Sequence, residues 1–254
     1  MLKQSLRGKT VILTGSSMTT SILNRIQQLG GEAHAFPLIK IVEILEPYDH
    51  MQLEMARNFD WLIFTSQNAV DAFCAKMVRH KFFPSMIKGK IAAVGEKTRD
   101  RLEANGLTVD FMPSIYSADY FIEEFPTIIE GKPRCLFVRG SKAKDTIKNG
   151  LPFSVDEWVV YDTEDFLEHI QSIVNIIKSK EQPIIIFASP SAVNVFAIHI
   201  APIVGWDSVK IASIGHITAH AIEKRGGHVT YQPNTYTMEA VIDEISNEEE
   251  EWND

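Results

Sequence analysis

The sequence has few cysteines and no excess of positive charge. Only two of its 254 residues are cysteine, Cys74 and Cys135, and each lies in an apolar stretch. We expect buried free thiols of a cytoplasmic protein, because small secreted domains rely on many more cysteines. The formal net charge is −8, which argues against the basic face that nucleic-acid binding requires.

Several signatures of common enzyme sites are also missing. The motifs Gly-x-Gly-x-x-Gly, Gly-x-x-x-x-Gly-Lys-Ser/Thr and Gly-x-Ser-x-Gly do not occur. Nucleotide binding by such loops and a hydrolase nucleophile elbow are therefore unsupported. His216 and His220 have the i, i+4 spacing of zinc ligands, but no third ligand accompanies them. We expect helix-surface histidines there and no metal site.

One long stretch without charge could be mistaken for a membrane span. Residues 183–206 contain no Asp, Glu, Lys or Arg, although prolines and polar residues interrupt them. Such a length is sufficient to cross a bilayer. The earlier stretch 60–77 has the same pattern with charges present. We therefore predict a buried strand followed by a buried helix in both places, and no membrane contact.

The chain contains a long internal repeat. Residues 91–125 align without a gap to residues 211–245, at an offset of 120, with 11 identities in 35 positions. Each copy has an apolar run, a glycine, a helical pattern and a second apolar run, which is typical of strand–helix–strand. An offset of this length indicates a duplicated half-domain rather than a solenoid. The identities include two pairs, Gly95 with Gly215 and Tyr116 with Tyr236.

Apolar runs alternate with helical patterns along the chain, which predicts an α/β fold of parallel sheets covered by helices. Two extended, linker-like stretches occupy residues 37–44 and 155–163. If these connectors pair, domain one is discontinuous, 1–37 plus 163–254, and domain two is 43–157. The repeat alone also allows a continuous division, 1–125 and 130–254. The acidic tail from Asn247 is expected to fray.

Ligands of open α/β sheets bind beyond the carboxyl ends of the strands. The turns predicted there are rich in glycine and small hydroxyl residues, and each is expected to begin a helix. Such turns offer backbone N–H groups and a positive helix end to an anion, although each hydroxyl could instead be an N-cap. The turns are Thr14-Gly15-Ser16-Ser17, Thr65-Ser66, Gly95 to Thr98, Arg139-Gly140-Ser141, Ser189-Pro190-Ser191 and Gly215 to Thr218.

Taken together, these motifs resemble the uroporphyrinogen-III synthase family. The resemblance covers nearly the whole chain, and it depends on the set of short motifs rather than on any one. The motifs are Thr65-Ser66-x-x-Ala69-Val70, Ala93-Val94-Gly95-x-x-Thr98, Val138-Arg139-Gly140, Val159-Val160-Tyr161-x-Thr163, Phe187-x-Ser189-Pro190-Ser191 and Ile214-Gly215-x-x-Thr218-Ala219.

The resemblance implies two flavodoxin-like domains, the first discontinuous, joined by a two-stranded extended connector. It implies a cofactor-free lyase of heme biosynthesis that acts on hydroxymethylbilane, a linear tetrapyrrole with eight carboxylates. That substrate loses water and closes to uroporphyrinogen III with ring D inverted, through a spiro intermediate. Catalysis of this kind depends mainly on positioning, with a weak acid assisting the leaving hydroxyl. We expect a monomer.

The resemblance also implies roles for individual residues. Tyr161, in the second connector, is the candidate acid, although a tyrosine there could instead be a core or interface residue. Thr218 is the second catalytic candidate. The implied substrate-binding residues are Thr14, Ser16, Thr65, Ser66, Gly95, Arg139, Ser189, Lys210 and Gly215.

The sequence departs from the family pattern at three positions. Gly15 stands where arginine is common, Gln67 where proline is frequent, and Ile217 where many members have a small or hydroxyl residue. Gly15 puts one carboxylate contact in doubt. The alternatives to a tetrapyrrole-cyclising enzyme are a two-domain protein that binds a small anion without chemistry and, third, a phosphosugar or nucleotide enzyme.

Overall fold

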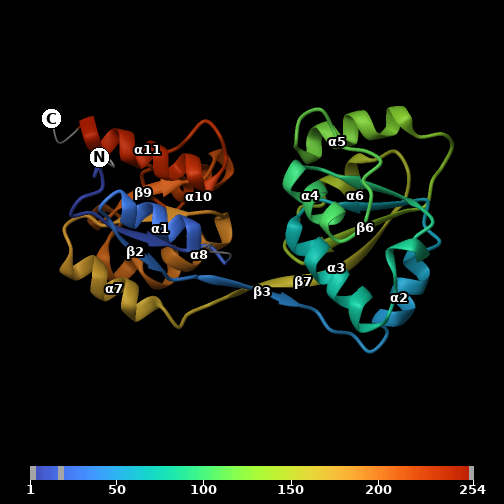
Figure 1. The fold of residues 1–254 in the computed structure, drawn as a ribbon, viewed down its shortest axis with the longest axis horizontal. Helices are drawn as coiled ribbons and strands as arrows, with labels where there is room; N and C mark the ends of the chain where they lie inside the picture. The colour runs from blue at the N-terminus through green and yellow to red at the C-terminus, as the bar shows by residue number, and fades with distance from the viewer. Residues whose placement is uncertain (1–3, 17–19, 252–254) are drawn as a thin grey trace. The chain divides into compact units, whose positions relative to one another are not determined.

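The structure, a computed structural model, describes residues 4–16 and 20–251. The chain divides into two compact units (Figure 1). Unit 1 combines the residues up to Lys40 with those from Glu164 onwards, and unit 2 is Ile41–Thr163. The α/β fold with parallel sheets is confirmed, because the central strands of each unit pair in parallel.

Unit 1 contains a four-stranded sheet in the order β2-β1-β8-β9. Beyond β9, Tyr231 forms an isolated parallel bridge with Ala212. The helices are α1 (Thr20–Gln28), α7 (Ile170–Ser179), α8 (Pro190–His199), α9 (Ala201–Val204), α10 (His216–Lys224) and α11 (Met238–Glu251). The strands are β1 (Thr10–Leu13), β2 (Glu32–Ala35), β8 (Ile184–Phe187) and β9 (Lys210–Ser213).

Unit 2 has the sheet order β3-β7-β6-β4-β5, and Phe111 bridges to Ala92 beyond β5. Its short 3₁₀ helices include η2 (Phe125–Ile128). The helices are α2 (Asp49–Ala56), α3 (Gln67–Arg79), α4 (Glu96–Ala104), α5 (Ala118–Glu124) and α6 (Thr146–Gly150). The strands are β3 (Ile39–Glu43), β4 (Trp61–Phe64), β5 (Lys90–Ala93), β6 (Cys135–Gly140) and β7 (Val155–Asp165).

The two sheets exchange halves of the repeat. The repeat makes β5 equivalent to β9 and β4 equivalent to β8. Yet β4 pairs with β6, and β8 pairs with β1, so each of these two strands lies beside a strand from the other half of the chain. The two strand orders are therefore the same once β1 is matched to β6 and β2 to β7. Unit 1 has the flavodoxin-like order 2-1-3-4-5 when the bridging residue counts as the fifth strand, and unit 2 has the same layout circularly permuted, because its chain enters at β4 and reaches β6 and β7 last.

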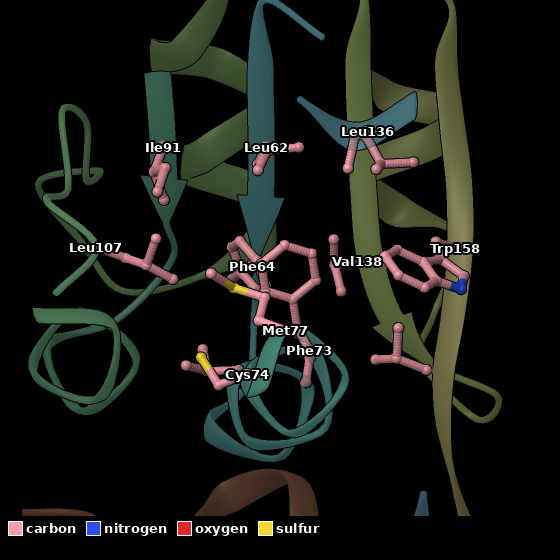
Figure 2. Packing of buried hydrophobic residues seen from close by; sticks show 14 of the residues in the cluster. Leu62, Phe64, Phe73, Cys74, Met77, Ile91, Leu107, Leu136, Val138 and Trp158 are labelled. Carbon is pink, nitrogen blue, oxygen red and sulfur yellow. The ribbon is translucent and has the colours of Figure 1, made fainter. Parts of the chain in front are cut away.

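Strand side chains alternate between two helix layers, as the pleat requires. In unit 2, Leu62 and Phe64 pack toward α3, where Phe64 and Phe73 meet edge to face (Figure 2). Trp61 and Ile63, on the other face, pack with the aromatic residues of α5 and η2. Burial of both faces explains why each central strand is a continuous apolar run.

The structure differs from the sequence prediction at three points. β7 is an interior strand with Val155, Trp158 and Val160 buried, and so it is more than a connector. The second strand expected in each copy of the repeat is reduced to an isolated bridge, at Phe111 and at Tyr231. The tail does not fray within the described residues, because α11 continues to Glu251 and buries Glu249.

Two other predictions are met. Cys74 and Cys135 are free and buried, and burial raises the pKa of their thiols to about 11 and about 12. Residues 183–206 form β8, α8, α9 and the 3₁₀ helix η3 (Trp206–Ser208). No helix within residues 4–16 and 20–251 is both long and apolar enough to cross a membrane.

Candidate active site

Tyr161 lies at the carboxyl edge of unit 2, the edge where its parallel strands end. It pairs with Gly140 across a bulge, since the β6–β7 register shifts between Arg139 and Gly140. A Cβ atom on Gly140 would lie 2.7 Å from the Tyr161 phenol oxygen and from ring carbon Cε2. The phenol therefore covers the backbone of Gly140, and only glycine fits beneath it.

Ser66 fixes the other side of the Tyr161 hydroxyl. Its Oγ lies 3.2 Å from the Tyr161 phenol oxygen and also accepts a hydrogen bond of 3.2 Å from the backbone N–H of Ala69. The second bond makes Ser66 the N-cap of α3. The N-capping interpretation is confirmed for this turn, but the same hydroxyl also orients the candidate acid. Thr65 lies next to it, half-buried.

Asp162 follows Tyr161 in β7 and adds a carboxylate to the carboxyl edge of unit 2. The Ser141 hydroxyl and the backbone N–H of Thr163 donate hydrogen bonds to its carboxylate. These contacts, led by Ser141, lower the pKa of Asp162. A carboxylate held ionised here disfavours a substrate carboxylate in direct contact and favours cationic character in a bound ligand.

A second tyrosine lies at the carboxyl edge of unit 2, over the turn that begins α4. A Cβ atom on Gly95 would lie 3.8 Å from the Cβ atom of Tyr116. Tyr116 is half exposed, and partial burial together with a hydrogen bond to Glu96 raises the pKa of its phenol. The phenol of Tyr116 is therefore held neutral beside a carboxylate.

Unit 1 repeats this arrangement with a different partner. Tyr236 packs on Gly215, whose Cβ would lie 3.0 Å from the ring. Its hydroxyl is 2.9 Å from Nδ1 of His216, the first residue of α10. The imidazole and phenol form one hydrogen-bonded pair at the turn, and both are exposed.

The remaining hydroxyls of unit 1 differ in accessibility. Ser189 caps α8, accepting from the backbone N–H of Ala192 at 3.5 Å. Thr14 is fully buried and donates to the Ile186 carbonyl oxygen at 2.8 Å, so the structure gives its hydroxyl a role in the sheet and not in ligand contact. Ser16 is exposed. Ser17, which completes that turn, lies outside the described residues.

Arg139 is not available for a substrate carboxylate. Its guanidinium is buried and bonds to Asp145 at 2.7 Å, to Glu157 and to the carbonyl oxygens of Ala143 and Gly140. Burial alone would lower the pKa of Arg139, but the Asp145 and Glu157 contacts raise it. Its role is to fold the loop after β6. That loop leads to α6 at Thr146, so this turn does not open directly onto a helix as expected.

Lys210 lies at the wrong edge of its sheet for the predicted site. It is the first residue of β9, at the amino edge, and its ammonium nitrogen is 2.5 Å from Glu249 of α11. The substrate-binding prediction for Lys210 is therefore contradicted by its position. The sequence gives no sign of this contact, because nothing in the pattern of the acidic tail links one of its glutamates to Lys210.

Thr218 and its repeat counterpart Thr98 are both buried in the first turn of their helices, with 4% and 5% of their surface exposed. The backbone N–H of Thr218 bonds to the Gly215 carbonyl oxygen at 3.1 Å, and that of Thr98 bonds equivalently to Gly95 at 2.9 Å. The same burial in both copies indicates that these threonines pack the turn.

Sequence reasoning missed the partners of the candidate residues. The sequence places Gly140 in a candidate anion-binding turn, but it does not indicate that Tyr161 requires glycine there. His216 was assigned to a solvated helix face, and Tyr236 was seen only as one identity of the repeat. The alignment of Tyr116 with Tyr236 was the available signal for a paired function at the two turns.

Known proteins match this chain over most of its length. A uroporphyrinogen-III synthase of Synechococcus elongatus is 27% identical over 95% of this chain and 96% of its own. Among solved structures, a mutant uroporphyrinogen III synthase of Thermus thermophilus has a TM-score of 0.69 at 16% identity, covering 96% of this chain and 99% of its own. The structure of uroporphyrinogen-III synthetase from Helicobacter pylori has a TM-score of 0.65 at 20% identity, covering 92% of this chain and 97% of its own. These structures support the fold.

A family model also matches most of the chain. The family model described as "Uroporphyrinogen-III synthase HemD" covers residues 21–243, which include all of unit 2, most of unit 1 and nearly all of both copies of the repeat. The Tyr161–Gly140–Ser66 arrangement lies within that range. The chain belongs to the uroporphyrinogen-III synthase family, whose enzymes serve tetrapyrrole biosynthesis.

Proposed function

We propose that this enzyme closes hydroxymethylbilane to uroporphyrinogen III, with Tyr161 assisting the first step. The observation that carries the assignment is the phenol of Tyr161, held at the carboxyl edge of unit 2 by Gly140 and Ser66. Its O–H donates a proton to the departing hydroxyl of the substrate, which leaves as water. A positioned weak acid of this kind accelerates a step without a cofactor.

The next steps require geometry more than chemical groups. Loss of water leaves an azafulvene cation on ring A, and the substituted carbon of ring D attacks it to form the spiro intermediate. That intermediate fragments and recloses with ring D inverted, and the proton released at the end restores the phenol. Asp162, the next residue of β7, is held ionised at the same edge by Ser141 and the Thr163 N–H, and a negative charge there favours the cation electrostatically.

We propose that the substrate carboxylates bind mainly at helix starts. Four turns, those before α3, α4, α8 and α10, place Ser66, Gly95, Ser189 and Gly215 as N-caps. The N–H groups of a first helical turn lack intrahelical partners and attract anions. Thr65 and Ser16 add accessible hydroxyls, and we assign Thr218 a positioning role because its side chain is buried.

An isomer assay tests the proposal. Freshly generated hydroxymethylbilane is supplied, the products are oxidised, and the uroporphyrin isomers are separated by chromatography. We expect more isomer III than in the protein-free control, in which hydroxymethylbilane closes spontaneously to isomer I. Isomer I alone would refute the cyclising activity and favour an anion-binding protein without chemistry. We further propose that the protein is a monomer and cytoplasmic. Gel filtration of the purified protein tests the monomer through its apparent mass.

A further inference from the structure

Unit 2 has a basic hollow at its amino edge, opposite the edge that carries Tyr161. The hollow has a volume of about 830 Å³ and is lined where β4 and β5 begin and by the segment before β6. Four cations and two carboxylates line it: Arg57, Lys88, Lys90, Lys132, Asp60 and Glu130. The net charge of these groups is positive, in a protein whose net charge is −8.

The cations of the hollow are largely uncommitted. Asp60 accepts a hydrogen bond from the backbone N–H of Arg134 at 2.7 Å, and Arg57 pairs with Glu54 outside the hollow at 2.9 Å. Within the described part of the chain, Lys88 and Lys132 make no ion pair. The Lys90 ammonium lies 5.5 Å from the centre of the Trp61 ring. Such lysines remain able to bind an anion.

Unit 1 shows what the equivalent edge looks like when it is filled. Glu249 of α11 is fully buried and lies 2.5 Å from both Lys9 and Lys210. The Tyr231 hydroxyl donates to the same carboxylate. One glutamate thus bridges the lysine before β1 and the lysine that begins β9.

The lysines of the two edges are equivalent through the repeat. The offset of 120 matches Lys90 to Lys210, each the first residue of its strand. Lys132 and Lys9 both follow a glycine with positive φ, at 73° for Gly131 and 76° for Gly8, shortly before β6 and β1. Unit 2 therefore has both lysines of the bridge.

What unit 2 lacks is a carboxylate at the position of Glu249, since within the described residues Asp60 and Glu130 form no ion pair with Lys90 or Lys132. The offset places Ile129 at the position of Glu249. The helix that carries it is also shorter, since α5 ends at Glu124 and the chain continues as the 3₁₀ helix η2, which contains Pro126. Proline inside a helix removes a hydrogen bond and stops it. The hollow, with Ile129 in its wall, occupies the place of the missing bridge.

We propose that this pocket binds a small polycarboxylate, one carboxylate of which lies between Lys90 and Lys132 as Glu249 lies between Lys210 and Lys9. The remaining carboxylates contact Lys88 and Arg57. Exposed ion pairs are individually weak, so a ligand needs several carboxylates to bind. The pocket lies at the opposite edge of the sheet from Tyr161 and is independent of the cyclisation chemistry.

Citrate titration followed by two-dimensional amide NMR tests the proposal on the full-length protein. We expect shifts at the amides of residues 88–90 and 129–132, and about fivefold weaker binding in Lys90→Gln/Lys132→Gln. Lys178→Gln, an exposed lysine of α7 in unit 1, is the matched control and leaves the affinity unchanged. Uroporphyrin III is the second probe. Tighter binding than citrate assigns the pocket to tetrapyrrole carboxylates, and weaker binding assigns it to a smaller molecule.

A second variant supplies the missing carboxylate from the chain itself. Ile129→Glu is expected to compete with citrate and weaken its binding at least fivefold, while the neutral Ile129→Gln retains it. Shifts that persist unchanged in both Lys90→Gln/Lys132→Gln and Ile129→Glu would overturn the proposal. An absence of shifts at residues 88–90 and 129–132 in the parent protein, at saturating citrate for a millimolar site, would overturn it as well.

Discussion

In unit 1 a glutamate from the last helix closes the amino edge of the sheet, whereas in unit 2 the same edge is hollow. The carboxyl edges differ in the opposite sense. Unit 2 carries Tyr161 over Gly140, while the corresponding turn of unit 1, after β1, has Thr14 buried in the sheet. The amino edge is thus closed by an ion pair in unit 1 and open in unit 2, and a tyrosine stands over the turn after β6 where the turn after β1 buries its threonine.

The features that both units share indicate what the duplication preserved. Both have an N-cap serine after a central strand, Ser66 and Ser189. Both also place a tyrosine over the glycine that begins the helix after the next strand. Only the partner of that tyrosine has changed, from Glu96 in unit 2 to His216 in unit 1. The shared groups are those to which we assign general binding of the substrate, and the changed groups distinguish the two turns.

Removing the Glu249 carboxylate should have the largest effect on stability. Glu249→Gln leaves Lys9 and Lys210 without their shared partner, and removal of one member of a buried ion pair costs about 3–5 kcal/mol. We expect that loss in the free energy of unfolding, measured by urea denaturation. Glu248→Gln, one residue away and exposed, is the control. Equal stability of the two variants would show that the bridge contributes nothing.

The same bridge makes stability depend on pH. Burial would raise the pKa of Glu249, but hydrogen bonds from Lys210, Lys9 and Tyr231 outweigh it and lower the pKa from 4.5 to about 2. A carboxyl with a depressed folded pKa stabilises the protein above its unfolded pKa, and this contribution is lost as pH falls. Between pH 4.5 and 2 the parent should therefore lose more stability than Glu249→Gln, as paired denaturation curves would reveal.

Gly140→Ala should disrupt the carboxyl edge of unit 2. The added methyl would overlap the Tyr161 ring, which costs about 1–3 kcal/mol of stability by overpacking. A phenol displaced by about 1 Å can also lose about 10²-fold in rate. Isomer III formation and unfolding are measured together. Gly95→Ala is the steric control, because its nearest contact is 3.8 Å, and it should lose only the capping preference of glycine over alanine at the start of α4, about 1 kcal/mol.

The sequence predicted the architecture well because its signals are local. Buried central strands such as β4 and β8 are continuous apolar runs, and the helix starts at Ser66 and Ser189 carry N-cap residues. The repeat then relates the two units. The sequence predicted only a connector at β7, because apolar and polar residues alternate there. The structure shows an interior strand whose Trp158 and Val160 are buried while Val159 is exposed.

The site was predicted less well because charges find their partners through the fold. Arg139 follows a predicted strand, but its carboxylates come from Asp145 and Glu157, which periodicity does not link to it. Lys210 and Glu249 are 39 residues apart, and only the docking of α11 brings them together. A run of acidic residues at the end of a chain is predicted to be solvent-exposed, and the sequence does not show that tertiary contacts bury one of them, Glu249.

Tyr161→Phe tests the chemical difference between the units. The variant keeps the ring over Gly140 and removes only the hydroxyl that bonds to Ser66. We expect formation of isomer III to slow by about 10²-fold, the lower end of general acid contributions, with little change in stability. Tyr236→Phe removes the hydroxyl of the unit 1 tyrosine and should slow the reaction less. Equal rates for Tyr161→Phe and the parent would remove the proposed role.

The smallest expected effects separate capping from orientation. Ser66→Ala and Ser189→Ala each remove an N-cap, so both should lose about 1 kcal/mol of unfolding free energy. Only Ser66 also holds the Tyr161 hydroxyl, at 3.2 Å. Ser66→Ala should therefore lower the rate further than Ser189→Ala, and Ser66→Thr, which keeps a hydroxyl, should restore most of it. If Ser66→Ala and Ser189→Ala slow the reaction equally, the two serines have equivalent roles and Ser66 does not orient the acid.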